Sequence, residues 1–171
     1  MMDPLSKISE QGDLLGKIRS FLSGFIGYLD RETRREADRL LREGVAQRFE
    51  EQWSRISEVQ RELASAGELK QVGALEAAAL KLRAFVDRVE GAASGYAGFF
   101  DAVRINQKEL ERLYGYDLEL LQKSDVLKTA VDELVAAIGK DGLPSAIQRV
   151  VVVSQDALDM FDRRRETIMA S

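Results

Sequence analysis

The side chains that most often carry out catalysis and metal binding are missing from this sequence. The 171 residues include no histidine and no cysteine. Histidine is the commonest general base and transition-metal ligand, and cysteine supplies thiolate nucleophiles, disulfides and zinc ligands. Ser-His-Asp and Cys-His catalytic arrangements are therefore impossible, as are zinc sites built from these two residues. We predict that the protein is not an enzyme and that it holds no metal and no cofactor.

Three short patterns resemble parts of binding sites, and none meets the full requirements of one. Residues 12–18 resemble a phosphate-binding loop, but only three residues separate the glycines, and Ile18 stands where a magnesium-binding Ser or Thr belongs. The basic run 163–165 fits cations that complement a helix C-terminus better than a phosphate clamp. Tyr114 and Tyr116 flank a glycine, so a site for a flat small molecule between helices stays open as an alternative.

Charge and hydropathy exclude several kinds of partner and location. The net charge is −4 and the isoelectric point is near 5.1, which argues against binding to nucleic acid. The first residues carry acidic side chains rather than the basic stretch of a secretion signal. The apolar stretch 14–29 is short for a membrane-spanning helix and contains Lys17 and Arg19. We therefore expect a cytoplasmic protein that binds no nucleic acid.

The elements that would position any site are long helices. Proline occurs only at Pro4 and Pro144, and the long interval without proline favours helices. Apolar residues recur at spacings of three and four, which is the period of one helix face. Gly67 has the position of a residue that follows a helix C-terminus. We predict a flexible N-terminal arm, residues 1–12, and a single helical-bundle domain, residues 13–171, with helical segments over 13–66, 68–123, 125–139 and 144–169.

The clearest periodic signal is a heptad repeat that extends from Val72 to Tyr114. A repeat of about 3.5 residues requires a partner helix packed along it. Gly91, Gly95 and Gly98 interrupt the repeat, and they leave a kink in one helix or a loop between two helices as open alternatives. We predict an all-α fold, in which a long antiparallel helical hairpin and additional C-terminal helices form an elongated up-down bundle.

Two further patterns each have two interpretations. Residues 30–43 carry acidic residues and arginines at spacings of three and four, which predicts a solvated helix face rather than a basic recognition patch. Residues 23–30 and 94–101 share the order small, Gly, aromatic, apolar, Gly, aromatic, apolar, Asp. This match is either a repeated structural element or a coincidence.

The N-terminal helical segment is the candidate interaction surface. Its apolar residues form one stripe, and a ridge of small residues beside the stripe would let another backbone approach closely. Packing inside the bundle, an oligomer interface and insertion into a membrane surface are the three interpretations of this segment. The candidate residues are Leu14, Leu15, Gly16, Ile18, Ser20, Phe21, Leu22, Gly24, Phe25, Ile26 and Leu29.

These observations favour a non-enzymatic helical interaction or scaffold protein. Its partner would be a protein, and first of all a second copy of the chain in a homo-oligomer, because the heptad repeat and the small-residue ridge both suit helix–helix association. The first alternative is a peripheral membrane-surface scaffold that uses the amphipathic helix 14–29. The second is a small-molecule binder or an enzyme with a site between helices, near Tyr114 and Tyr116.

Overall fold

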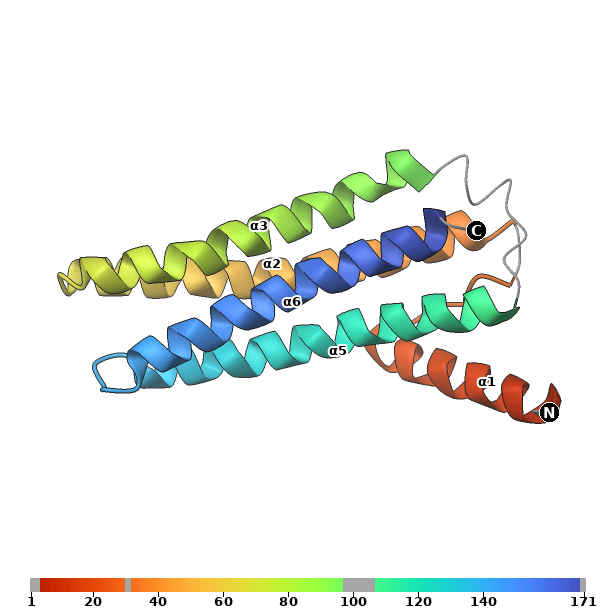
Figure 1. Cartoon of the computed structure of the whole chain (residues 1–171), viewed down its shortest axis with the longest axis horizontal. Helices are drawn as coiled ribbons and strands as arrows, with labels where there is room; N and C mark the ends of the chain where they lie inside the picture. Colours follow the sequence, from red (N-terminus) through yellow and green to blue (C-terminus); the bar gives the residue numbers. More distant parts are fainter. Residues whose placement is uncertain (1–3, 30–31, 97–106, 170–171) are drawn as a thin grey trace.

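α-Helices account for all the regular structure in the described part of the chain. A computed structural model describes residues 4–29, 32–96 and 107–169. The predicted all-α fold class is confirmed across these residues. The helices are α1 (Pro4–Phe21), α2 (Arg34–Ser65), α3 (Leu69–Tyr96), α5 (Gln107–Ala137) and α6 (Leu143–Met169) (Figure 1).

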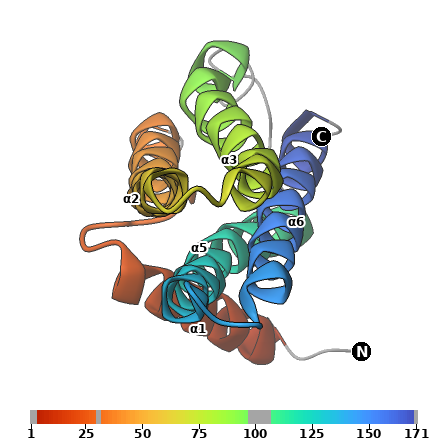
Figure 2. The same ribbon diagram turned by 90° about the vertical axis from the view of Figure 1, so that its left-hand side faces the viewer.

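Four of the helices form an elongated bundle, and α1 lies outside it. Around the bundle, α2 contacts α3 and α5, and α6 contacts the same two helices. α1 packs chiefly against α5 on the outside of the bundle, as the end-on view in Figure 2 shows. The 32 residues of α2 give it a length of about 48 Å at about 1.5 Å per residue, so the bundle is long and narrow. The predicted up-down helical bundle is confirmed.

Two helical hairpins, α2–α3 and α5–α6, lie side by side with their equivalent helices parallel (Figure 1). Polar side chains bridge each parallel pair at two points that are seven residues apart on both helices. Because the residue numbers increase in the same direction on both helices of a pair, these bridges define a parallel register. The bridges are Arg48–Asp125 and Arg55–Asp132 between α2 and α5, and Lys81–Gln155 and Arg88–Asp162 between α3 and α6.

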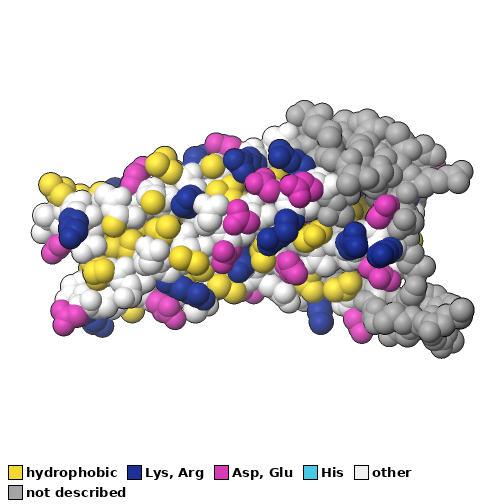
Figure 3. Space-filling model, viewed as in Figure 1, with side chains coloured by type: hydrophobic (Ala, Val, Ile, Leu, Met, Phe, Trp, Pro, Cys, Tyr) yellow, Lys and Arg dark blue, Asp and Glu magenta, His cyan; other side chains and the backbone are white. Residues whose placement is uncertain are grey.

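Figure 3 shows charged side chains of both signs spread along one face of the bundle, between hydrophobic ones.

The turn between α2 and α3 forms where the sequence predicts it. Gly67 has a φ of +79°, a left-handed conformation that suits glycine because it has no Cβ. Its N–H donates to the carbonyl of Ala64 at 3.1 Å, and the N–H of Glu68 donates to the carbonyl of Leu63 at 2.9 Å. These two bonds close the last turn of α2 and reverse the chain, which confirms the predicted hairpin.

The bundle core is built from the predicted periodic positions. Val72, at the start of the heptad repeat, is half-buried, and positions of the repeat between 92 and 107 lie outside the residues whose burial is described. The valine run 150–153 prefers strands but lies within α6. The buried seam positions are Phe49, Gln52, Ile56, Val59 and Leu63 in α2, Leu75, Ala79, Leu82, Val86 and Val89 in α3, and Leu110 and Tyr114 in α5.

Two predicted boundaries near the N-terminus are wrong. α1 begins at Pro4, so residues 4–12 are helical and do not form a flexible arm. α1 also ends at Phe21, so the amphipathic helix predicted over 14–29 is shorter than expected, and its last residues form a loop. The predicted helical segment over 13–66 is therefore interrupted before α2.

The predicted boundaries in the middle of the chain also need correction. The segment 68–123 is divided between α3 and α5. α3 continues as a helix through Gly91 and Gly95 to Tyr96, whereas Gly98 lies outside the described residues. α5 passes through Ser124 without interruption, so no separate helix begins at residue 125. None of the described helices combines the length and the apolarity needed to cross a membrane.

Candidate functional site

The predicted interaction surface is divided between α1 and the loop that follows it, loop 22–29. Its apolar residues from Leu14 to Phe25 face the bundle, whereas its small residues lie in the open, since a Cβ at Gly12 or Gly16 would meet nothing within 4 Å. The structure therefore brings the stripe and the ridge onto opposite sides of α1. Ile18, Leu22 and Phe25 are buried, Leu14, Leu15 and Phe21 are half-buried, and Gly16, Ser20, Gly24, Ile26 and Leu29 are exposed.

Loop 22–29 leaves the helical path because two of its glycines have left-handed backbones. Gly24 has a φ of +87° and Gly27 a φ of +90°, a region in which side chains are strained. The N–H of Phe25 donates to the carbonyl of Leu22 at 3.3 Å, which forms a tight turn in place of another helical turn. The apolar residues after Phe21 therefore reach the core from an irregular segment.

Two aromatic residues hold loop 22–29 against α5. Phe25 and Tyr28 are fully buried, and the Tyr28 ring is stacked on Tyr114 with their centroids 5.3 Å apart. The N–H of Tyr28 donates to the Tyr114 hydroxyl at 2.8 Å. A Cβ at Gly27 would overlap that hydroxyl, so glycine is required for this close approach. The loop is thereby tied to the bundle by its own backbone as well as by its side chains.

Arginine side chains hold the outer side of the same segment. Arg19 Nε donates to the carbonyl of Phe25 at 2.8 Å, and Arg34 Nε donates to the carbonyl of Tyr28 at 2.6 Å. Arg48 on α2 lies over the ring of the last residue of α1, with its guanidinium carbon 4.9 Å from the ring centroid. These contacts fix the chain on both sides of the turn that ends α1.

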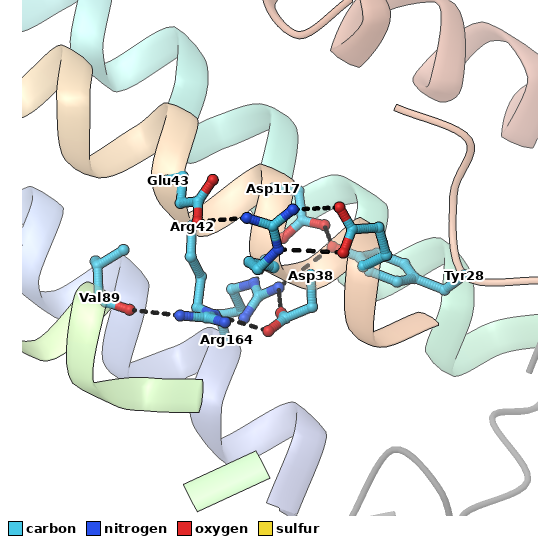
Figure 4. Close-up of polar contacts among 9 residues, drawn as sticks. Tyr28, Asp38, Arg42, Glu43, Val89, Asp117 and Arg164 are labelled. Carbon is cyan, nitrogen blue, oxygen red and sulfur yellow. Dashed lines mark hydrogen bonds and ion pairs between the residues drawn. The ribbon is translucent and has the colours of Figure 1, made fainter. Parts of the chain in front are cut away.

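A buried network of charged side chains lies beneath loop 22–29, with Arg164 of α6 at its centre. Arg164 Nε donates to Asp117 Oδ1 on α5 at 2.6 Å, and its Nη2 donates to Asp38 Oδ1 on α2 at 2.7 Å. The Tyr28 hydroxyl donates to the second oxygen of Asp117 at 2.5 Å. Figure 4 shows these side chains converging from the loop and from three helices. Arg164 and Asp117 are completely buried.

Arg42 extends the network toward α3. Its Nε donates to Asp38 Oδ2 at 2.7 Å, and its Nη1 donates to the carbonyl of Val89 at 3.3 Å (Figure 4). Two arginines and two aspartates therefore share the site, and their formal charges cancel. This balance is what permits the burial, because an unpaired charge in the core would be strongly unfavourable.

Burial and pairing act in opposite directions on the ionisation of this network. Burial raises the pKa of Asp117 to about 6, although Arg164 and Tyr28 both stabilise its charged form. Burial disfavours the charge of Arg164, but Asp117 and Asp38 outweigh this effect and raise its pKa well above the usual value. Burial and the charge of Asp117 likewise raise the pKa of Tyr28. At neutral pH, Asp117 and Arg164 are therefore both charged and Tyr28 is protonated.

The geometry of the buried network suits a role in positioning loop 22–29 and the helices. Arg164, Asp117 and Tyr28 are inaccessible to solvent, and their polar atoms bind largely to one another. Tyr114, a candidate for contact with a flat ligand, is fully buried and its hydroxyl accepts the Tyr28 N–H, whereas Tyr116 is half-buried. Within the described residues, no group of three or more carboxylates converges as metal ligands would.

The sequence patterns did not predict the buried network. The interpretation of residues 30–43 as a solvated helix face holds for Arg39, which pairs with two glutamates at the surface, but it is wrong for Asp38 and Arg42. The interpretation of the run 163–165 as a helix end is wrong for Arg164, because this side chain lies in the core.

A signal for these residues does exist in the sequence. The α2 seam, extended backward from Phe49 in steps of four, three and four, reaches Val45, Arg42 and Asp38. In α6, the same alternation places Arg164 three residues after the last buried aromatic residue of that helix. Periodicity thus predicts that charged residues occupy core positions, although it does not predict their partners.

No similarity to known proteins helps to assign this site. Comparisons with protein-family models, with curated proteins and with solved structures found no match. The function is therefore inferred from the geometry of the described residues alone.

Proposed function

We propose that this protein is a non-enzymatic helical interaction protein that associates with a second copy of itself by exchanging α1. The observation that supports the proposal is the position of α1. Each helix of the bundle packs against two others of the bundle, whereas α1 packs chiefly against α5. A helix held along one neighbour separates more easily than a helix enclosed on two sides, because it loses less buried apolar surface.

The composition of α1 favours exchange. Gly12 and Gly16 lie in the helix interior, where each glycine costs about 1 kcal/mol relative to alanine. Leu14, Leu15 and Phe21 stay half-exposed even when α1 is docked. Part of the apolar surface of α1 is therefore available to a partner, and the helix gains little stability on its own.

The end of α1 provides a hinge for the exchange. Ser23 and Gly24 are exposed, and they separate α1 from the buried anchors Phe25 and Tyr28. For α1 to leave the bundle while these anchors stay in place, the hydrogen bond from Arg19 to the Phe25 carbonyl and the contact of Arg48 with the Phe21 ring must break. Two chains would then exchange α1 helices and form between them the contacts that each forms internally, which is the low-cost route to a symmetric dimer.

Engineered cysteines test this proposal directly, because the chain contains none. A Cβ on Gly44 would lie 3.4 Å from Leu22 Cγ, so cysteines at these two positions have side chains close enough for a disulfide. We expect the oxidised Leu22→Cys/Gly44→Cys variant to form covalent dimers, and their fraction on non-reducing gels should rise with protein concentration.

The single variants Leu22→Cys and Gly44→Cys are the controls, since neither can form the 22–44 bond, and Leu22→Cys is the better matched because the new Cβ of Gly44→Cys would overlap Leu22 Cδ2. Exchange requires that the double variant forms substantially more covalent dimer than either control. Oxidation that yields only an internally cross-linked monomer at every concentration would contradict the proposal.

A further inference from the structure

Loop 22–29 presents two aliphatic side chains to solvent from a fixed backbone. Ile26 is 55% exposed and Leu29 is 68% exposed, and both are among the most exposed large hydrophobic residues. Each directly follows a fully buried aromatic anchor, Phe25 before Ile26 and Tyr28 before Leu29. Because buried and exposed residues alternate in this way, the anchors hold the exposed pair in position.

A guanidinium group accompanies each exposed aliphatic residue. Arg19 binds the carbonyl of Phe25, and Arg34 binds the carbonyl of Tyr28. Each of these carbonyls belongs to the residue immediately before one of the exposed pair. Both cations are therefore placed at the backbone that carries the exposed side chains.

The surrounding sequence is basic in an otherwise acidic chain. The whole chain has a net charge of −4. The segment 14–35, which contains the loop, has more basic than acidic residues and so carries the opposite sign, although Asp13 and Glu36 flank it directly. Its five basic residues are Lys17, Arg19, Arg31, Arg34 and Arg35, and its two acidic ones are Asp30 and Glu32.

We propose that loop 22–29 is a contact site for an anionic phospholipid surface. Ile26 and Leu29 enter the interface between headgroups and acyl chains, and Arg19 and Arg34 face the lipid phosphates. Aliphatic residues flanked by cations match a surface that is negatively charged outside and apolar beneath. The fixed loop loses little conformational entropy on binding, because its backbone is already ordered. Ile26 and Leu29 are the exposed apolar part of the interaction surface predicted from sequence, whereas the apolar stripe within α1 faces α5.

Co-sedimentation with vesicles tests the proposal on the full chain. The vesicles contain phosphatidylcholine alone, or phosphatidylcholine with about a third phosphatidylserine. We expect binding to the phosphatidylserine vesicles only, with a loss of roughly tenfold or more in the Ile26→Ser/Leu29→Ser variant, since two inserted aliphatic side chains are removed. Arg19→Gln should weaken binding severalfold and Arg19→Lys should retain most of it, because only the first removes the charge.

The chain offers a matched control for the loop variant. Leu69 and Leu80 are 71% and 62% exposed and lie on α3, so Leu69→Ser/Leu80→Ser removes the same kind of surface elsewhere. This control should bind vesicles as the unmodified chain does. Equal binding to both vesicle types, or equal losses in the two double variants, would overturn the proposal.

A second copy of the chain is the competing occupant, and light scattering on the same variants identifies it. If Ile26→Ser/Leu29→Ser converts a dimer to a monomer and vesicles are not bound, the loop contacts protein and the lipid proposal is wrong. The proposal does not depend on exchange of α1, because the cysteine cross-link reports on Leu22 and Gly44, whereas vesicle binding reports on Ile26 and Leu29.

Discussion

At the scale of single residues, Arg164 joins segments that are distant in the sequence. Its partners Asp117 and Asp38 lie 47 and 126 positions away, and its guanidinium also reaches the Tyr28 hydroxyl. Removal of one partner from such a buried pair leaves an uncompensated charge, which typically costs about 3–5 kcal/mol. The network therefore favours one arrangement of the loop and the helices over others with similar apolar burial.

Asp117 should make the stability of the protein depend on pH. Its pKa is about 6 in the folded chain, against an ordinary value of 3.8. The folded state therefore binds the proton more tightly, so stability is gained as the pH falls from about 6 to about 4 and lost as it rises through this window. We expect the free energy of unfolding of the unmodified chain, relative to Asp117→Asn, to increase on acidification by up to about 3 kcal/mol.

Urea denaturation of both proteins at several pH values between 4 and 7 measures this difference. Asp117→Asn is the suitable comparison because it keeps the shape of the side chain but cannot titrate. A difference between the two proteins that stays constant with pH would contradict this prediction and show that the ion pair with Arg164 offsets the cost of burial, and a difference that falls on acidification would show that it outweighs this cost.

The residue scale also shows the limit of prediction from sequence. The seam spacing places Asp38, Arg42 and Arg164 at core positions, yet charged side chains usually mark a solvated face. Only the partners resolve this conflict, and most of those partners come from other helices. Periodicity thus predicts the burial of a charged side chain only when the oppositely charged partner that stabilises it in the core is also known.

At the scale of elements, the apolar residues of loop 22–29 have the spacing of a helix face although the segment is not helical. Leu22, Phe25 and Tyr28 are spaced by three, as on a helix face, and all three are buried. Their burial instead comes from a loop that packs over Tyr114. The periodicity therefore predicts correctly which side chains are buried but not the backbone that carries them. The two glycines of the segment were the signal for a loop, because both have left-handed backbones.

Gly27 should be the least replaceable residue of this element. Gly27→Ala introduces a strained positive φ and places a methyl group against the Tyr114 hydroxyl. We expect a loss of about 1–3 kcal/mol in the free energy of unfolding, measured by urea denaturation. Gly24 has a similar φ, but a Cβ there would meet nothing within 4 Å, so Gly24→Ala should lower the free energy of unfolding by less. The difference between the two variants measures the cost of the overlap with Tyr114, apart from the backbone strain.

Gly16→Ala provides the opposite control, since Gly16 is inside α1 and its Cβ would meet nothing within 4 Å. This substitution should stabilise α1 by up to about 1 kcal/mol. If all three glycine variants change the free energy of unfolding by the same amount and in the same direction, neither the left-handed backbone nor the close approach to Tyr114 requires glycine in loop 22–29.

At the scale of the whole molecule, the two hairpins are nearly equal in size. α2 and α3 contain 32 and 28 residues, and α5 and α6 contain 31 and 27. The similar sequences 23–30 and 94–101 precede the first and the second hairpin. The described parts of the two segments differ in backbone, because Gly24 lies in a loop with a φ of +87° whereas Gly95 lies inside α3, so a repeated element stays a hypothesis that rests on the sequence match alone.

The helices themselves could be predicted from sequence, but the order in which they pack could not. Each helix of the bundle carries an apolar seam at the same spacing, and no seam specifies its neighbour. The parallel contacts of α2 with α5 and of α3 with α6 depend on complementary polar residues beside the seams. Arg55 and Asp132, which bind at 2.6 Å, belong to this set.

Charge reversal tests whether these bridges select the packing. Arg55→Glu or Asp132→Lys alone should lower the free energy of unfolding by roughly 0.5–1 kcal/mol, and the doubly reversed chain should recover most of the loss. The effect is small because Arg55 and Asp132 are partly solvated, and it should shrink further at high salt. Arg55→Glu combined with Asp141→Lys, in the exposed turn after α5, supplies the control without a facing partner. If that control recovers as much stability as the facing pair, net charge rather than register explains the result, and the order of helices must then be attributed to the shapes of the apolar seams.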